Sequence, residues 1–494
     1  QYDRFIQYDH FKIINPLLEP KIVRDNEWET IGKLFKKEEL ENMSVAQAIM
    51  KIRSCEKYPA YELCISYYKE IADYCYKNNR ITELLSYVND SNATEIDAYN
   101  IILVLGNSKY SRTFCSVDML QQFKLFIEHA YEMDDSETKT DALRALMMIL
   151  ENFIYDYPEE LYDLCIRIDD KKLWKGAIDE FIPNKDNLVF DTINSGISML
   201  YTLIVKSLNK LKEKNIKFNE MLKQFKHWFD CRITTNNKHF FYSMAYNFQG
   251  LCNLDRIWTE SICKELFNNQ YKAEMILICF HYVMTLNKSI VEIIFDKDLF
   301  KTIYDNKEYS SFDKNRMTEY VVTAHFFDMI DDVKYKEFLD YLPENEMKPL
   351  FNKTVYEMKC EEDIINTYQI VKGRIRRDDV YTDIMESLES LKISNDETWN
   401  IICDCLSKIN FMPNNWLEFD ELFVNNIDNI TKGYLKAFEL YTKKFIPRSE
   451  EMIFDILKKL SKNDAIRIAN NLIDKQLSYT DKVKEFINDV KQSG

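Results

Sequence analysis

The residues best suited to bind a partner are the basic side chains between positions 206 and 232. Aromatic side chains are interleaved with them, and only three acidic residues share the segment. In an acidic protein, such a segment can hold an acidic peptide, a phosphorylated tail or nucleic acid. A solvated helix face whose aromatic residues point into the core produces the same pattern. The candidate binding residues are Lys206, Lys210, Lys214, Lys217, Lys223, Lys226, Trp228 and Arg232.

A second basic cluster follows Gly373 and consists of Arg374, Arg376 and Arg377. Guanidinium groups bind carboxylates and phosphates through paired hydrogen bonds, so this cluster is a second candidate for partner binding. The alternative is that these arginines balance the partial negative charge at the C-termini of helices.

Two carboxylate-rich segments could hold magnesium and a diphosphate. They are Asp328-Met-Ile-Asp331-Asp332 and Asn395-Asp396-Glu397. They resemble in part the Asp-Asp-x-x-Asp and Asn-Asp-x-x-Ser-x-x-x-Glu motifs of isoprenoid synthases, but neither has the full spacing. The resemblance implies an all-α magnesium/diphosphate enzyme as one alternative. Carboxylates at these positions also fit helix N-termini, where they favour the helix dipole.

Other kinds of catalytic or ligand site find no support in the spacing of residues. The glycines occur singly, whereas phosphate-binding loops need them close together so that backbone amides can approach the ligand. The six histidines form no zinc-type cluster with each other or with cysteine. Cys279 and His281 are two residues apart, so they lie on different faces of a helix, and a core histidine is expected there. We therefore expect no enzyme activity, cofactor or bound metal.

Acidic residues are concentrated in two further segments, 132–137 and 156–170. A basic segment of a partner could bind there. Solvation of exposed loops explains such clusters equally well.

The composition predicts an all-α protein. The chain of 494 residues contains only 8 Gly and 9 Pro, too few for the turns of sandwiches, barrels or βαβ folds. The net charge of −16 argues against binding phosphate backbones as a main function. Twelve scattered cysteines without a Cys-x-x-Cys pair are typical of a reducing compartment, so we expect cytoplasm and/or nucleus.

Apolar residues recur at helical spacing along most of the chain, as in Leu143, Met147 and Leu150. Another stripe joins Leu254, Trp258, Ile262 and Leu266. Capping residues divide the stripes, and they predict helix starts after Ser116, at Pro158, after Asn395 and after Pro447. The apolar run 275–284 has ten residues, half of what a membrane span needs, and predicts a helix buried on nearly all sides.

Many short helices without linkers predict an α-solenoid, in which antiparallel helix pairs bury their faces by stacking. At this level the chain resembles armadillo- and HEAT-type solenoids, which implies a right-handed superhelix. No clean 34-residue period of tetratricopeptide or pentatricopeptide type emerges. We predict an irregular N-terminal segment at 1–26 and a continuous helical repeat domain at 27–493, with two lobes that could meet near 180–190.

Function follows from this architecture. The leading hypothesis is a non-enzymatic scaffold, adaptor or assembly chaperone that belongs to a larger complex and binds partner proteins along an extended helical surface. An acidic or phosphorylated peptide segment is one expected partner, and no membrane span is expected. The alternative is a helical-repeat protein that binds nucleic acid through the basic segment 206–232.

Overall fold

The structure is a computed structural model, and the part of the chain that it describes is almost entirely helical. No described residue lies in a β-strand, so the all-α prediction is confirmed. The predicted N-terminal segment 1–26 lies outside the described residues. These are residues 34–54, 61–111, 116–130, 137–170, 188–235, 237–282, 287–296, 299–409, 417–445, 447, 449–473, 475 and 479–492.

The chain divides into two compact units, and each is described by itself. Unit 1 comprises residues 1–182 and 194–228, and unit 2 comprises residues 183–193 and 229–494. One helix, α15 (Phe218–Ile233), begins in unit 1 and ends in unit 2.

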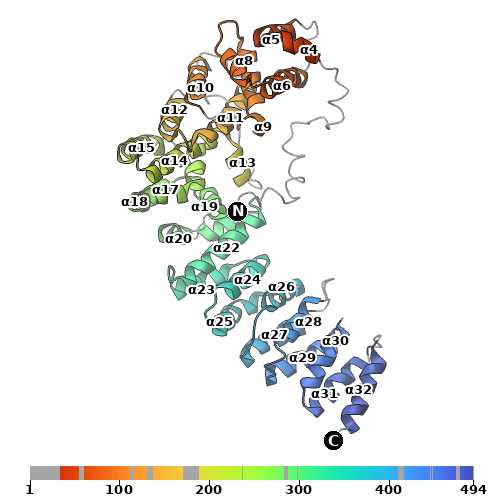
Figure 1. Cartoon of the computed structure of the whole chain (residues 1–494). Coiled ribbons are helices and arrows are strands. Elements are labelled where there is room, and N and C mark those ends of the chain that lie inside the picture. Colours follow the sequence, from red (N-terminus) through yellow and green to blue (C-terminus); the bar gives the residue numbers. More distant parts are fainter. Residues whose placement is uncertain are drawn as a thin grey trace. The chain divides into compact units, whose positions relative to one another are not determined.

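In unit 1, helices pack mainly against the second or third helix along the chain. One row runs α6, α8, α11, α14, and the other runs α5, α7, α10, α12, with α12 also against α14 (Figure 1). The helices are α4 (Lys37–Asn42), α5 (Val45–Arg53), α6 (Tyr61–Lys77), α7 (Ile81–Tyr87), α8 (Glu95–Leu105), α9 (Ser108–Ser111), α10 (Val117–Ala130), α11 (Glu137–Leu150), the 3-10 helix η1 (Glu151–Phe153), α12 (Pro158–Asp170) and α14 (Gly196–Lys214).

Unit 2 contains one row in which each helix packs against the next member of the row. This row runs α16, α19, α22, α24, α26, α28, α30. The last five of these helices begin 31 to 39 residues after the one before, so the repeat length varies. The members are α16 (Lys238–Tyr246), α19 (Lys272–Tyr282), α22 (Ser311–Phe326), α24 (Met347–Glu357), α26 (Asp378–Leu388), α28 (Leu417–Asn425) and α30 (Glu450–Lys459).

The remaining helices of unit 2 include a second row, in which α23, α25, α27, α29 and α31 pack in that order. This pattern of two rows is compatible with a helical-repeat architecture, and the solenoid of stacked helix pairs and the right-handed superhelix stay predictions. The helices are α13 (Leu188–Asn194, whose last residue is in unit 1), α17 (Phe248–Leu254), α18 (Arg256–Leu266), α20 (Lys288–Phe295), α21 (Leu299–Asp305), α23 (Asp332–Tyr341), η4 (Glu344–Glu346), α25 (Glu361–Val371), η5 (Lys372–Arg374), α27 (Asp396–Lys408), α29 (Lys432–Lys444), α31 (Lys462–Ile473) and α32 (Thr480–Gln492).

Most of the predicted helix starts are confirmed. Helix α10 begins after Ser116, whose hydroxyl accepts a hydrogen bond from the third residue of the helix, and α12 begins at Pro158. Asn395 caps α27 by accepting from the Glu397 amide at 2.9 Å. The start predicted after Pro447 was wrong, because Ser449 caps α30 and the helix begins at Glu450.

The predicted stripe from Leu254 to Leu266 was also wrong as a single helix. It is divided between α17 and α18, because Asp255 is extended and its carboxylate accepts a hydrogen bond from the Trp258 amide at 3.0 Å. An N-cap of this kind ends one helix and starts another without glycine or proline. Apolar spacing alone did not reveal the break.

The apolar run beginning at Met275 forms the predicted inner helix. All side chains from Met275 to Phe280 in α19 are buried. This helix packs against α16 on one side and α22 on the other, which explains an apolar surface around most of its circumference.

Helices α27 and α29 approach each other closely at Gly433, which has no side chain. A Cβ atom added to Gly433 in α29 would lie 2.6 Å from the Trp399 Cβ of α27. The Gly433 amide also donates to Asp396 Oδ1 at 2.9 Å. Trp399 is fully buried, so the close approach of α27 and α29 depends on the missing Cβ.

No single described helix is long and apolar enough to cross a membrane. Helices α13 and α14 pass that test only as a bent pair, and most of the apolar side chains of α14 are buried in the protein.

Candidate functional site

Most lysines of the basic segment contact residues of η1 and α12 or the loop between them. Lys206 Nζ donates to Glu151 Oε1 and Lys217 Nζ donates to Glu159 Oε1, both at 2.5 Å. Lys214 donates to the Tyr155 carbonyl. These three cations therefore already have partners, although exposed ion pairs of this kind contribute little to stability.

Lys210 also contacts residues of unit 1. It forms an ion pair with Glu213 at 2.7 Å and lies 4.9 Å from the centre of the Tyr155 ring. One ion pair, Lys217 with Glu159, thus connects the basic segment to the acidic segment 156–170, which the sequence offers as a separate binding site.

The aromatic residues of the basic segment belong to the core. Trp228 is buried, stacks on Phe225 with ring centres 5.5 Å apart, and donates through Nε1 to Asp169 Oδ2 at 2.8 Å. The Tyr201 hydroxyl donates to the other oxygen of the same carboxylate at 3.0 Å. Asp169 therefore joins α12, α14 and α15, and Trp228 is not available to stack on a ligand.

The rest of the segment is spread along α15. Lys223 is exposed and has no polar partner among the described residues. Lys226 and Arg232 are half-buried and engaged in contacts within the chain, and Arg232 lies in the last turn of the helix, beyond the boundary of unit 1. The segment does not form one surface of free cations.

Within the second basic cluster, Arg374 binds the end of a helix. Arg374 donates to the Asp340 carbonyl and, at 2.9 Å, to the Leu342 carbonyl, which lie at the C-terminus of α23. Burial lowers the pKa of Arg374. Arg377 forms an ion pair with Asp379, and the Arg376 side chain is exposed.

The carboxylates considered for magnesium are also placed at helix ends. Asp331 is the N-cap of α23 and accepts from the Lys334 amide at 2.8 Å, and Asn395 caps α27 as described above. Asp396 accepts from the backbone of α29. Across the described ranges, no group of three or more His, Cys, Asp or Glu side chains could hold a metal ion.

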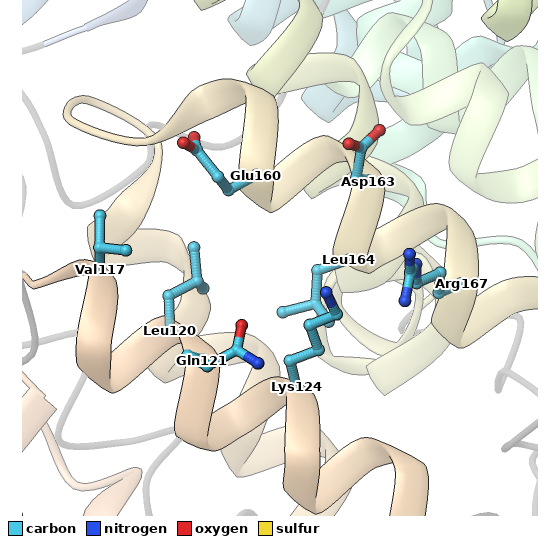
Figure 2. Close-up of a pocket in the computed structure, with 8 residues that line it drawn as sticks. All are labelled: Val117, Leu120, Gln121, Lys124, Glu160, Asp163, Leu164 and Arg167. Carbon is cyan, nitrogen blue, oxygen red and sulfur yellow. The ribbon is translucent and has the colours of Figure 1, made fainter.

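A groove lies between α10 and α12 of unit 1 (Figure 2). Its volume is about 140 Å³. Each helix contributes four residues at helical spacing, which places them on one face. The lining residues are Val117, Leu120, Gln121 and Lys124 of α10 and Glu160, Asp163, Leu164 and Arg167 of α12.

The groove has an apolar floor and charges at its rim. Leu120 and Leu164 are buried, whereas 48% of the Val117 surface is exposed. Figure 2 shows Lys124 pointing from α10 toward α12, with Arg167 at the same end of the groove. Among the described residues, the ion partner of Arg167 is Glu128, with its carboxylate 3.8 Å from the guanidinium group.

The two carboxylates of the groove lie on the α12 side. Figure 2 shows both Glu160 and Asp163 on α12, with their carboxylates directed away from α10. Partial burial and the neighbouring Glu159 carboxylate raise the pKa of Asp163. Lys124 forms no hydrogen bond or ion pair with a described residue, and the Glu128 carboxylate lies one turn further along α10.

No protein-family model matches this chain, and no curated protein or solved structure is significantly similar to it. The resemblance to armadillo and HEAT solenoids thus remains one of architecture. Function has to be inferred from the surfaces of the two units.

Unit 2 exposes apolar side chains at one end of α22, α23 and α24. Phe327 follows the last residue of α22, Val333 lies in the first turn of α23, and Tyr356 lies in the last turn of α24. Their exposed fractions are 60%, 77% and 78%. A hydrogen bond from Thr323 Oγ1 to Glu357 Oε1 at 3.3 Å places the ends of α22 and α24 side by side.

Sequence reasoning did not select Val117, Lys124 or Arg167. The helix starts at Val117 and Pro158 were predicted. Helical spacing from these starts would place residues 117, 120, 121 and 124 on one face and residues 160, 163, 164 and 167 on another. What the sequence does not contain is that α10 and α12 are neighbours whose facing side chains leave a groove.

Proposed function

We propose that this protein is a non-enzymatic scaffold, adaptor or assembly chaperone that binds other proteins as a subunit of a larger complex. The observation that supports this most is the exposed apolar group Phe327, Val333 and Tyr356 at the end of α22 to α24. Exposed apolar residues at neighbouring helix ends are a feature of many protein-binding sites.

The use of charged residues agrees with this proposal. The lysines, arginines and carboxylates singled out in the sequence largely pair with each other or cap helices, and such roles need no chemistry. Two rows of stacked helices also provide long outer faces, on which a partner segment can contact several repeats. An armadillo- or HEAT-like superhelix in the cytoplasm or nucleus is the finer form of the proposal.

Affinity isolation of the full chain from its native cell after mild crosslinking tests this function. We expect a protein to be recovered with the chain in equal amount. The double variant Phe327→Ser/Tyr356→Ser should lose at least about 90% of it, because removal of two central apolar side chains typically costs more than a factor of ten in affinity.

Ile257→Ser is the matched control, since Ile257 is an exposed apolar residue of α18 in the same unit. It should retain the partner. Recovery of the chain alone from crosslinked cells would contradict the scaffold function, and equal loss in both variants would contradict the role of the α22–α24 end.

A further inference from the structure

A stack of two rings joins α22 to α23 at the α22–α24 end. The ring of His325, in the last turn of α22, lies parallel to the buried ring of Tyr335 in α23. The ring centres are 3.8 Å apart, and the planes differ by 6°. Phe327 follows His325 by two residues, and Val333 precedes Tyr335 by two. The stack therefore holds together the two segments that carry these exposed apolar side chains.

The surroundings of His325 suit its uncharged form. The side chain is half-buried, and its Nδ1 atom is buried without a hydrogen-bond partner among the described residues. An imidazolium ion donates hydrogen bonds from both ring nitrogens, so protonation in the stack would leave a buried donor unpaired. Burial lowers the pKa of His325.

Charged neighbours act in the opposite direction but do not outweigh burial. The carboxylates of Asp332, Asp363 and Asp328 and the backbone of Ile330 raise the pKa of His325. Other charged or titratable groups on the elements packed against α22 are exposed or have contacts of their own. They are the exposed Lys334 and Lys336 of α23, the ion pair of Lys353 with Glu357 on α24, His281 of α19 beside Asp313, and Glu346 of η4 beside Thr318.

The connection between α22 and α23 favours opening when the ring is charged. Asp328 has a φ of 57°, a left-handed conformation that is uncommon outside glycine, and its amide donates to the His325 carbonyl at 3.0 Å. The carboxylates of Asp328 and Asp332 lie at the two ends of this connection. An imidazolium that leaves the stack can therefore reach both water and carboxylates, so protonation and opening favour each other.

We propose that protonation of His325 weakens the binding of a partner protein at the α22–α24 end. A partner that covers Phe327 and Val333 also approaches the half-exposed ring of His325, and it binds the form in which the uncharged ring is stacked on Tyr335. The inference rests on the proposed scaffold function and adds its regulation by pH. Acidification from pH 7.5 to 5.5 then favours the free protein.

Hydrogen exchange of the full chain tests the stack without a partner. His325→Phe keeps a ring beside Tyr335 and cannot be protonated. The exchange rate of amides 326–333 in the wild type, divided by that in His325→Phe, should rise about two- to tenfold from pH 7.5 to 5.5. The ordinary histidine pKa of about 6.5 sets the upper limit, because the open form gains the proton as pH falls through that value. Glu346 titrates in both proteins, so its effect cancels.

His227→Phe is the control, because His227 is an exposed residue of α15 and undergoes the same substitution. Its exchange rates at 326–333 should equal those of the wild type at both pH values. If His325→Phe is less stable than the wild type in thermal unfolding at pH 7.5, His325→Tyr replaces it.

The partner recovered by affinity isolation, labelled with a fluorophore, is the probe for binding. Its affinity for the wild type should fall about two- to tenfold from pH 7.5 to 5.5 and should fall less for His325→Phe. Titration of the partner itself affects both proteins equally. Equal pH dependence of the two proteins in either measurement would overturn the proposal.

The two proposals fail in different ways. A partner that is recovered from cells and binds the wild type and His325→Phe with the same pH dependence leaves the scaffold function standing and removes only the regulation. Recovery of the chain alone contradicts the scaffold function, whatever the exchange measurement shows.

Discussion

Glu346 is the buried group whose replacement should change stability most clearly with pH. It is the last residue of η4, and its fully buried side chain accepts from Thr318 Oγ1 of α22 at 2.9 Å. The Asn315 amide, oriented with its nitrogen toward the carboxyl group, donates at 2.9 Å. Lys314 binds backbone carbonyls and only weakly favours the charged form of Glu346, so burial raises the pKa of Glu346 to about 7.

The sign of the effect follows from where the proton is held. Between pH 4.5 and 7 the folded protein keeps a proton on Glu346 that the unfolded chain releases, so the free energy of unfolding falls as pH rises. A difference of about 2.5 pKa units corresponds to about 3 kcal/mol at 1.36 kcal/mol per unit. This stability is present below pH 4.5 and is lost as pH rises through 7.

Glu346→Gln removes the titration and keeps an acceptor for Thr318. The variant should equal the wild type near pH 4.5 and be more stable by up to about 3 kcal/mol at pH 8. Hydrogen exchange of the α22 and α24 amides, corrected for the intrinsic pH dependence of exchange and followed by mass spectrometry, measures the free energy of opening in this part of unit 2.

Glu362→Gln is the control, because Glu362 is an exposed residue of α25. It should leave the pH dependence unchanged. If the profiles of Glu346→Gln and wild type run parallel from pH 4.5 to 8, then burial does not hold Glu346 in its neutral form and the reasoning is refuted.

Two further predictions concern the packing of unit 2 and the basic segment. Gly433→Ala should lower the midpoint of thermal unfolding, since the added Cβ meets Trp399 and overpacking typically costs about 1 to 3 kcal/mol. Gly373→Ala is the control, because open space surrounds Gly373, and it should leave the midpoint unchanged. Equal midpoints for the two variants would show that α27 and α29 can separate freely. If the chain binds single-stranded RNA through the segment 206–232, its affinity should fall steeply with added salt and should fall in Lys223→Glu; salt-independent binding, or no effect of the variant, would remove the nucleic-acid alternative.

Short-range features of the fold were predictable from the sequence. Ser116 and Asn395 mark helix starts because their side chains accept hydrogen bonds from backbone amides in the first turn. Pro158 marks one because it has no amide hydrogen to leave unpaired there. Both properties are local. The break at Asp255 was missed for a related reason. The apolar spacing continues through it, and only the direction of the backbone shows that Leu254 and Trp258 belong to different helices.

The candidate sites were less predictable, because charge in a sequence does not reveal what lies opposite. Lys206 and Glu151 are 55 residues apart, and nothing in either segment indicates that they meet. Trp228 was read as part of a binding surface, and its partner Asp169 lies in another helix. Lys124 was not selected, because a single lysine on an amphipathic helix is ordinary until the groove beside it is seen.

The sequence by itself determined that the described chain is helical and where most of its helices begin, since scarce glycine and proline, caps and apolar spacing act within a few residues. Only the tertiary structure decided which helices are neighbours, which charges are already paired, and which cations have no partner among the described residues. These depend on contacts between residues about 30 to 60 positions apart, and the 31- to 39-residue spacing of the helices in one row of unit 2 is too irregular to appear as a sequence period. The same packing leaves the α10/α12 groove and the α22–α24 end as the surfaces on which function is to be sought.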